Sequence, residues 1–236
     1  MDIKYFLPGT DKQLHSLLSH VDIKNMKILV LGSGCEEISK LLLNNSASEV
    51  TIIVEDNDSL LNARLHLSKE KQISVKMMEF DNTDFKDSSF DLIYAQASIS
   101  SKQRNKIVKE VKRILKSEGY FCVGENISYS KNPPVFVKDL WESSEIVPLF
   151  VDDLEKYYED RNFEILFKQD LSHTLKDFYK MSADLLENKA NNLTEQEKSY
   201  HKKFLNKLSH ESNAYLILGG NDFMGFKMLI LKAAKQ

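Results

Sequence analysis

The stretch Lys27-Ile-Leu-Val-Leu-Gly-Ser-Gly-Cys35 decides the fold. Its four consecutive apolar residues predict a strand. Gly32 and Gly34 then predict a sharp turn, because glycine adopts backbone angles that other residues avoid and lets a ligand approach closely. A helix follows, and its unpaired N–H groups favour a polar or anionic group at that turn. By itself, such a turn is more often a plain connection between a strand and a helix.

Acidic residues end the next predicted strand, Val50-Thr-Ile-Ile-Val54. Glu55 follows this strand directly, and a carboxylate there can accept both hydroxyls of a ribose, as in dinucleotide-binding folds. Asp56 is the second candidate for this role. The alternative is a pair of solvated turn acids.

A third polar turn, Phe80-Asp-Asn-Thr-Asp84, follows a predicted strand at residues 73–78. Asp81 and Asn82 are candidates for binding an adenine, whose amino group a carboxylate can accept. Ordinary turn chemistry is the alternative, since Asp, Asn and Thr are common turn residues.

The predicted strand at residues 90–94 ends on Tyr94, and Ala95 and Gln96 follow it. Open α/β sheets bind ligands at this kind of switch point. We therefore expect Ala95 and Gln96 beside the cofactor and the substrate, whereas Tyr94 is explained equally well as a core aromatic.

Strands and helices alternate along residues 27–124, which predicts parallel βαβ units with right-handed crossovers. Gly119 is expected to cap the last helix of this region. The apolar spacing predicts strands at 27–31, 49–54, 73–78, 90–94 and 120–124, and helices at 11–21, 36–44, 58–69 and 103–116.

The pattern changes after Pro133-Pro134. Helices are predicted at 151–160, 173–188 and 194–209, and strands at 163–167 and 224–231. Two helices between the last strands exceed what a hairpin needs, so we expect a cap. The prediction is one domain over residues 1–236, with a core at about 25–170 and 214–236 and cap elements at about 1–24 and 172–213. We expect Tyr5–Leu18 and residues 173–209 to close over the carboxyl ends of the strands.

The composition limits the class of protein. With 42% hydrophobic and 28% charged residues, the 236-residue chain is globular. No apolar run approaches the ~20 residues of a membrane span, and no secretory signal pattern is present. A net charge of −3 argues mildly against a nucleic-acid substrate. Two cysteines are too few for a disulfide framework and favour the cytoplasm, and the scattered histidines predict no metal site.

Together, residues 25–125 resemble the core of the class I S-adenosylmethionine (SAM)-dependent methyltransferases, and the resemblance extends more loosely to 170 and to 225–233. Within that class, the chain most resembles enzymes acting on small molecules, such as the ubiquinone- and menaquinone-type methyltransferases. The segments similar to the usual motifs are Leu31-Gly-Ser-Gly34, Ile53-Val-Glu55, Phe80-Asp81, Ser89-Phe-Asp-Leu-Ile93 and Arg113-Ile-Leu-Lys-Ser-Glu-Gly-Tyr120.

This resemblance implies an α/β fold with a doubly wound, mostly parallel seven-stranded sheet, an antiparallel last strand and a small helical cap. It implies SAM as the cofactor, S-adenosylhomocysteine as the product and a small-molecule acceptor. The reacting atom, a catalytic residue and the oligomeric state do not follow from the sequence. The expected cofactor-binding residues are Gly32, Ser33, Gly34, Glu55, Asp56, Asp81, Asn82, Ala95 and Gln96. We also expect a valine at Gly34 to abolish binding by filling the approach space.

Two departures keep an alternative open. Val30 stands where many members have an acid, and Cys35-Glu36 stands where many have a third glycine. These motivate a non-catalytic binding or scaffold protein of the same fold. A nicotinamide-dependent oxidoreductase ranks last, because Glu37 stands where the dinucleotide fingerprint has glycine.

Other motifs have plainer explanations. Asn132-Pro-Pro-Val135 is similar to an amine-methylating motif but lies outside its usual place, so we interpret it as a rigid turn. Cys35 fits a packing role better than a nucleophile. His173 is a weak candidate for a general base, and Trp141 is equally consistent with a pocket wall and with helix packing.

Overall fold

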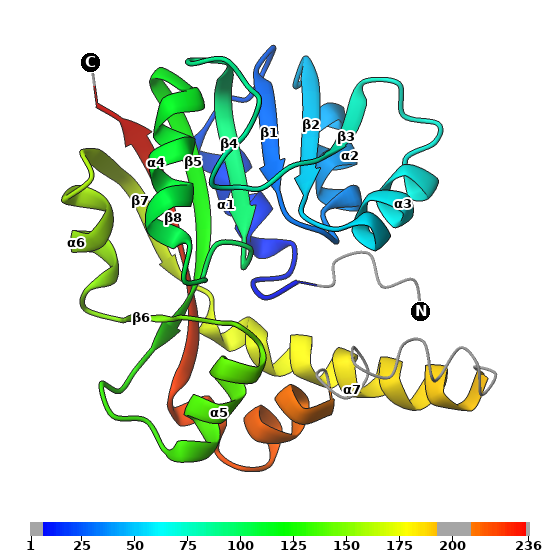
Figure 1. The fold of residues 1–236 in the computed structure, drawn as a ribbon, viewed down its shortest axis with the longest axis vertical. Helices are drawn as coiled ribbons and strands as arrows, with labels where there is room; N and C mark the ends of the chain where they lie inside the picture. The colour runs from blue at the N-terminus through cyan, green and yellow to red at the C-terminus, as the bar shows by residue number, and fades with distance from the viewer. Residues whose placement is uncertain (1–6, 193–208, 235–236) are drawn as a thin grey trace.

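The computed structural model describes residues 7–192 and 209–234 (Figure 1). The predicted helix at 194–209 therefore lies almost entirely outside the described residues. The helices are α1 Lys12–His20, α2 Glu36–Asn44, α3 Asn57–His66, α4 Arg104–Ile114, α5 Val135–Ser143, α6 Leu154–Glu159 and α7 Leu175–Asn192, and residues 209–216 are also helical. The strands are β1 Lys27–Leu31, β2 Glu49–Val54, β3 Ile73–Met77, β4 Phe90–Gln96, β5 Leu115–Ser128, β6 Leu149–Phe150, β7 Phe163–Asp170 and β8 Met224–Ala233.

The strands form one sheet in the order β3-β2-β1-β4-β5-β8-β7. Strands β1 to β5 pair in parallel, and β8 runs antiparallel to both of its neighbours, β5 and β7. The predicted seven-stranded, mostly parallel sheet with an antiparallel last strand is confirmed. The two-residue strand β6, which pairs in parallel with β5, was not predicted.

Helices cover both faces of the sheet, because successive side chains of a strand point to opposite faces. Ile28 and Val30 of β1 pack in one cluster with residues of α1, α2 and α3. Leu29 and Leu31 pack in a second cluster with residues of α4 and α6. The continuous apolar run of β1 is therefore explained by burial on both faces, and Val30, the first departure from the family pattern, is a core residue.

A second group of helices lies at the carboxyl ends of the parallel strands (Figure 1). We call α5, α7 and residues 209–216 the helical lobe. α7 occupies the predicted cap, whereas α5 was not predicted. The Pro-Pro segment, interpreted as a rigid turn, leads directly into α5, since Pro134 is the residue that caps this helix.

The junction of α4 and β5 differs from the prediction. The helix ends at Ile114, and Leu115 is already extended and pairs with Phe90. The register then shifts, so that Leu92 pairs with Tyr120. The residue with a positive φ in this bulge is Glu118, at 61°. The expected role of Gly119 as a helix cap is therefore wrong, because the chain turns directly from helix to strand.

Candidate active site

A small cavity of about 210 Å³ is lined by residues from all four of the predicted strand-ending loops. It lies where β1, β2 and β4 end, as expected for a ligand site in an open α/β sheet. We call it the small cavity. Its lining is Leu7, Gly32, Ser33, Val54, Glu55, Asp56, Phe80, Gln96, Ala97 and Ser98. Five predicted site residues thus share one cavity, namely Gly32, Ser33, Glu55, Asp56 and Gln96.

Within the glycine turn, Gly32 and Ser33 line the cavity. The φ of Gly32 is +118°, and a Cβ placed on this residue would lie 2.8 Å from the Cβ of Ser98. Gly34 also has a positive φ, +76°, but its nearest neighbour would be Leu7 at 3.7 Å. Gly34 does not line the small cavity. A Cβ would therefore be crowded at Gly32 and would make only an ordinary contact at Gly34, and the expected effect of a valine at Gly34 stays a prediction.

Glu55 and Asp56 have different hydrogen-bond partners. One Glu55 oxygen, Oε1, accepts the backbone N–H of Phe80 at 3.0 Å, and Oε2 has no hydrogen-bond partner within the described part of the chain. Both Asp56 oxygens bind Ser59, through its backbone N–H at 2.8 Å and its hydroxyl at 2.7 Å. Asp56 is therefore the N-cap of α3. Glu55 is the better candidate for binding ribose hydroxyls.

Glu55 lies in a group of acids. Desolvation raises the pKa of its carboxyl, and the nearby charges of Glu79, Asp81 and Asp56 raise it further, against the hydrogen bond from Phe80. A hydrogen-bond donor placed beside Glu55 would therefore relieve an unfavourable charge.

The two residues predicted to bind adenine, Asp81 and Asn82, both line a hollow along α4, but only Asp81 also lines a larger cavity. Asp81 faces this larger cavity, and its carboxylate lies 3.9 Å from the Lys106 ammonium. Asn82 is exposed and lines the hollow along α4, together with Lys106 and Lys109. Asp81 thus shares the large cavity with Glu55, whereas neither Asp81 nor Asn82 lines the small cavity.

Ala95 and Gln96 contact the N-terminal segment. Ala95 is buried, and its carbonyl accepts a hydrogen bond from the side chain of Gln13 at 3.0 Å. The Gln96 amide donates to the carbonyls of Pro8 at 2.7 Å and Thr10 at 2.8 Å. Its oxygen accepts the hydroxyl of the buried Tyr94 at 2.5 Å. Gln96 thereby holds residues 7–10 over the carboxyl end of β4.

The N-terminal segment also contacts the helical lobe, because the backbone N–H of Gly9 donates to the Thr174 hydroxyl at 3.1 Å. Residues 7–10 and α7 therefore lie at the carboxyl ends of the strands, as the expected closure requires (Figure 1). Tyr5 lies outside the described residues.

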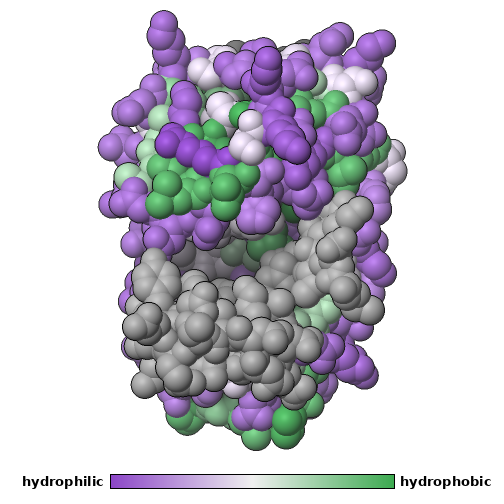
Figure 2. All heavy atoms as spheres, turned by 90° about the vertical axis from the view of Figure 1, so that its right-hand side faces the viewer, coloured by the Kyte–Doolittle hydropathy of each residue, from purple (hydrophilic) through white to green (hydrophobic). Residues whose placement is uncertain are grey.

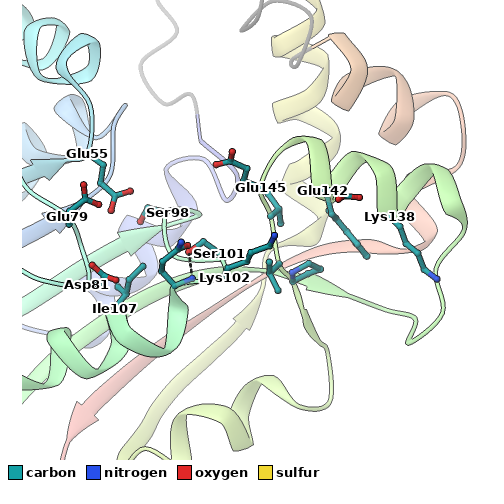
Figure 3. Close-up of a pocket in the computed structure, with 15 residues that line it drawn as sticks. Glu55, Glu79, Asp81, Ser98, Ser101, Lys102, Ile107, Lys138, Glu142 and Glu145 are labelled. Atoms are coloured by element: carbon teal, nitrogen blue, oxygen red, sulfur yellow. Dashed lines mark hydrogen bonds between the residues drawn. The ribbon is translucent and has the colours of Figure 1, made fainter.

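A second cavity of about 690 Å³, which we call the large cavity, adjoins the small one. Glu55 and Ser98 line both. The Ser98 hydroxyl is buried and has no hydrogen-bond partner among the described residues. Figure 3 shows Glu55, Glu79 and Asp81 on one side of this cavity, and Lys138, Glu142 and Glu145 on the other. Figure 2 shows the surface hollowed at mid-height between the two ends of the molecule.

A buried ion pair fixes one wall of the large cavity. Arg104 Nε lies 2.9 Å from a Glu125 oxygen, and the two side chains are only 6% and 1% exposed. The hydroxyls of Ser100 and Tyr158 donate to the same carboxylate at 2.5 Å and 2.7 Å. The Arg104 guanidinium also donates to the carbonyl of Val147, which lines the cavity. The sequence analysis missed this pair, although an acid inside the apolar run of β5 is the signal that indicates a buried partner.

The weaker sequence candidates lie elsewhere, except Trp141, which lines the large cavity. His173 is exposed, and its Nε2 lies 3.0 Å from the Lys12 ammonium. Burial raises the pKa of the Cys35 thiol and raises that of Cys122 to about 12, so neither is a nucleophile.

The described residues contain no metal-binding cluster and no membrane-spanning helix. No group of three or more His, Cys, Asp or Glu side chains in residues 7–192 and 209–234 is arranged to hold a metal ion. No helix within the same ranges is both long and apolar enough to cross a membrane.

Comparisons with known proteins agree with this geometry. Residues 29–123 match the family described as "Methyltransferase domain". No curated protein matches the chain. Similar solved structures include phosphoethanolamine N-methyltransferase 2 of Haemonchus contortus in complex with SAM, with a TM-score of 0.80, 14% identity, and coverage of 98% of this chain and 54% of that one.

Two further structures have the same fold. The geranyl diphosphate C-methyltransferase of Streptomyces coelicolor A3(2) has a TM-score of 0.72, 10% identity, and coverage of 95% of this chain and 76% of that one. The [4+2]-cyclase SpnF has a TM-score of 0.74, 15% identity, and coverage of 96% and 81%. At these identities the likeness shows the fold alone, and one fold can host different chemistries. The family match over residues 29–123 and the strand order together support a class I SAM-dependent methyltransferase, with SAM as its cofactor and S-adenosylhomocysteine as its product.

Proposed function

We propose that this protein transfers the methyl group of SAM to a small-molecule acceptor. The observation that carries the proposal is the pair of adjoining cavities, which meet at Glu55 and Ser98. The small cavity joins the glycine turn to the carboxylate of Glu55. The large cavity, at about 690 Å³, has the size of a small-molecule pocket. A cytoplasmic setting, expected from the cysteine content, is part of the proposal.

The residues of the small cavity fit this cofactor. Gly32 lines the cavity at a position where a Cβ would collide with Ser98, and Glu55 has a carboxylate oxygen for ribose hydroxyls that makes no hydrogen bond with the described residues. The buried Ser98 hydroxyl lacks a partner among the described residues. Such groups suit SAM, which carries a ribose and a charged methionine end. The predicted roles of Gly34, Asn82 and Ala95 have less support, because none of these residues lines the small cavity.

SAM supplies an activated methyl group, which bonds to a nucleophilic atom of the acceptor as the carbon–sulfur bond breaks and its electron pair stays on sulfur. The protein's contribution is to position the two molecules and to exclude water. Gln96 and residues 7–10 cover the carboxyl end of β4. No histidine lines either of the two cavities within the described structure, so a proton lost by the acceptor passes to a carboxylate or to solvent.

The resemblance to the ubiquinone- and menaquinone-type enzymes stays a prediction. Glu55, Glu79, Asp81, Glu142 and Glu145 all line the large cavity. Binding a neutral, apolar ring would desolvate these carboxylates without giving them a partner. The lining therefore does not support an assignment to the ubiquinone- and menaquinone-type enzymes.

Cofactor titration tests the proposal. Calorimetry should show binding of SAM and of S-adenosylhomocysteine, and incubation with SAM and an acceptor should release the product. Glu55→Ala should weaken binding by ~1–3 kcal/mol, because ribose hydroxyls would lose a charged acceptor. Asp56→Ala is the control, since it removes an adjacent acid that caps α3. It should lower the free energy of unfolding by ~0.5–2 kcal/mol and leave affinity nearly unchanged.

The absence of heat with either cofactor in the wild type would contradict the proposal and favour a non-catalytic protein. Equal losses of affinity in Glu55→Ala and Asp56→Ala would contradict the assignment of Glu55.

Acidification should weaken cofactor binding. An ionised Glu55 accepts two hydroxyls, and a protonated one does not. Affinity is therefore complete above the pKa of Glu55 and falls as the pH decreases through it. Because this pKa is raised by desolvation and by neighbouring acids, the loss should begin at a higher pH than for an ordinary glutamate. Calorimetric titration of S-adenosylhomocysteine across a pH series measures it, and Glu55→Gln should flatten the profile. Identical profiles for the wild type and the variant would exclude Glu55 as the titrating group.

A further inference from the structure

We propose that the methyl acceptor carries a positively charged nitrogen, an amine or a quaternary ammonium, and that the α5 wall of the large cavity binds it. This wall comprises Trp141, Glu142, Glu145, Ile146, Val147 and Pro148. The inference rests on the proposed function, because it takes the small cavity as the cofactor site.

The position of the wall suits an acceptor. The two cavities meet at Glu55 and Ser98, so a molecule in the large cavity reaches the edge of the cofactor site. The α5 wall lies at the other side of the same cavity (Figure 3). An acceptor that spans the cavity would therefore have one part at the cofactor and another at this wall.

The chemistry of the wall favours a cation. Glu142 and Glu145 make no ion pair and no side-chain hydrogen bond with any other residue that the structure describes. Trp141 lies beside them in the lining and is only 8% exposed. Glu142 and Glu145 are exposed to solvent, so Trp141 is the buried member of the three. An indole ring and a carboxylate both attract an ammonium.

Two lysines line the same cavity, Lys138 and Lys102, and neither forms an ion pair with Glu142 or Glu145 in the described structure. Figure 3 shows the Lys138 ammonium on the side of α5 that is remote from Glu55. Lys102 enters the cavity from the opposite wall, and no ion pair within the described structure joins it to Glu142 or Glu145. An anionic group elsewhere in the acceptor would meet Lys102, whereas the wall itself stays negative.

The wall is held in place before a ligand arrives. The N–H of Val147 donates to the carbonyl of Ser100 at 2.8 Å, and the Val147 carbonyl accepts from Arg104. The N–H of Ile146 donates to the carbonyl of Trp141 at 2.8 Å, and the Ser144 hydroxyl binds Glu211. A wall fixed to both the sheet and the helical lobe loses little conformational freedom on binding, which favours affinity and selectivity.

The test compares two probes of nearly the same shape, choline and its neutral carbon analogue 3,3-dimethylbutan-1-ol. The protein is first saturated with S-adenosylhomocysteine, and each probe is then titrated. Trp141 is the chain's only tryptophan, so its fluorescence reports on the wall directly, and calorimetry gives the affinity. Choline should bind about tenfold more tightly than the neutral analogue and should change the fluorescence.

Variants locate the effect. Glu142→Gln combined with Glu145→Gln should reduce the preference for choline to near parity. Asp139→Asn removes an acid from the same helix that is exposed and outside the lining, so it should keep the full preference. Equal or tighter binding of the neutral analogue, an unchanged preference in the double variant, or no binding of either probe at millimolar concentration would overturn the inference. Failure of S-adenosylhomocysteine itself to bind would instead overturn the proposed function, so the two failures are distinguishable.

Discussion

Replacing Arg104 with methionine is expected to lower the free energy of unfolding by about 3–5 kcal/mol, because the change leaves a buried carboxylate without its cation. Glu125 is 1% exposed, and Arg104 is the only basic residue paired with it in the described structure. The hydroxyls of Ser100 and Tyr158 still donate to the carboxylate, but they do not neutralise it.

Urea denaturation measures this loss of stability. Two further variants test whether it comes from the unpaired buried charge. Lys116→Met removes the cation of an ion pair with Asp91 that is 45% and 29% exposed, so it should cost at most ~1 kcal/mol. Arg104→Met combined with Glu125→Met should recover much of the loss, since an apolar pair leaves no buried charge. A loss in Arg104→Met no larger than in Lys116→Met would contradict the assigned role of the buried pair.

The same pair matters for the site, because Arg104 also binds the carbonyl of Val147. A partly destabilised Arg104 variant that still folds should therefore have a displaced α5 wall, while Glu55 and the glycine turn keep their contacts. The buried ion pair thus links the stability of the fold to the shape of the large cavity.

The central elements were predictable from local pattern. The predicted bounds of β1, β2 and α2 agree with the structure, because these segments alternate apolar runs with clear turn residues. The direction and place of β8 followed from the resemblance to the methyltransferase class. Glu55 was preferred over Asp56 from its position alone, and the capping bonds of Asp56 give the physical reason.

The features that the sequence did not reveal depend on contacts distant along the chain. The side chain of Gln96 binds carbonyls of Pro8 and Thr10, and no local pattern encodes that contact. α5 begins with Val135-Phe-Val137, residues with low helix preference, and is held by packing of Val137 and Leu140 in the core. Since α5 supplies a wall of the large cavity, the acceptor side of the site was not visible before the fold was known.

Replacing Gly32 with alanine is expected to reduce affinity for S-adenosylhomocysteine by at least tenfold relative to the matched variant Gly34→Ala. The alanine should also add about 1–3 kcal/mol of backbone strain to the glycine turn. Both positions have a positive φ, so alanine is strained at each. Only at Gly32 would the new methyl group lie 2.8 Å from the Ser98 Cβ, a distance that requires the turn or the loop after β4 to move.

Calorimetry with the wild type, Gly32→Ala and Gly34→Ala measures this difference in affinity. Two controls distinguish the effect of steric crowding from the effect of backbone strain. Gly219→Ala also places alanine at a positive φ, +81°, with no atom within 4 Å of its Cβ, so it measures the cost of strain without a clash. Ser98→Gly in the Gly32→Ala background removes the Cβ that the new methyl group meets. It should restore part of the affinity if crowding is the cause, although it also removes the unpartnered Ser98 hydroxyl. If Gly32→Ala binds as tightly as Gly34→Ala, the cofactor does not depend on close approach at this turn, and Glu55 alone would have to define the small cavity as its site.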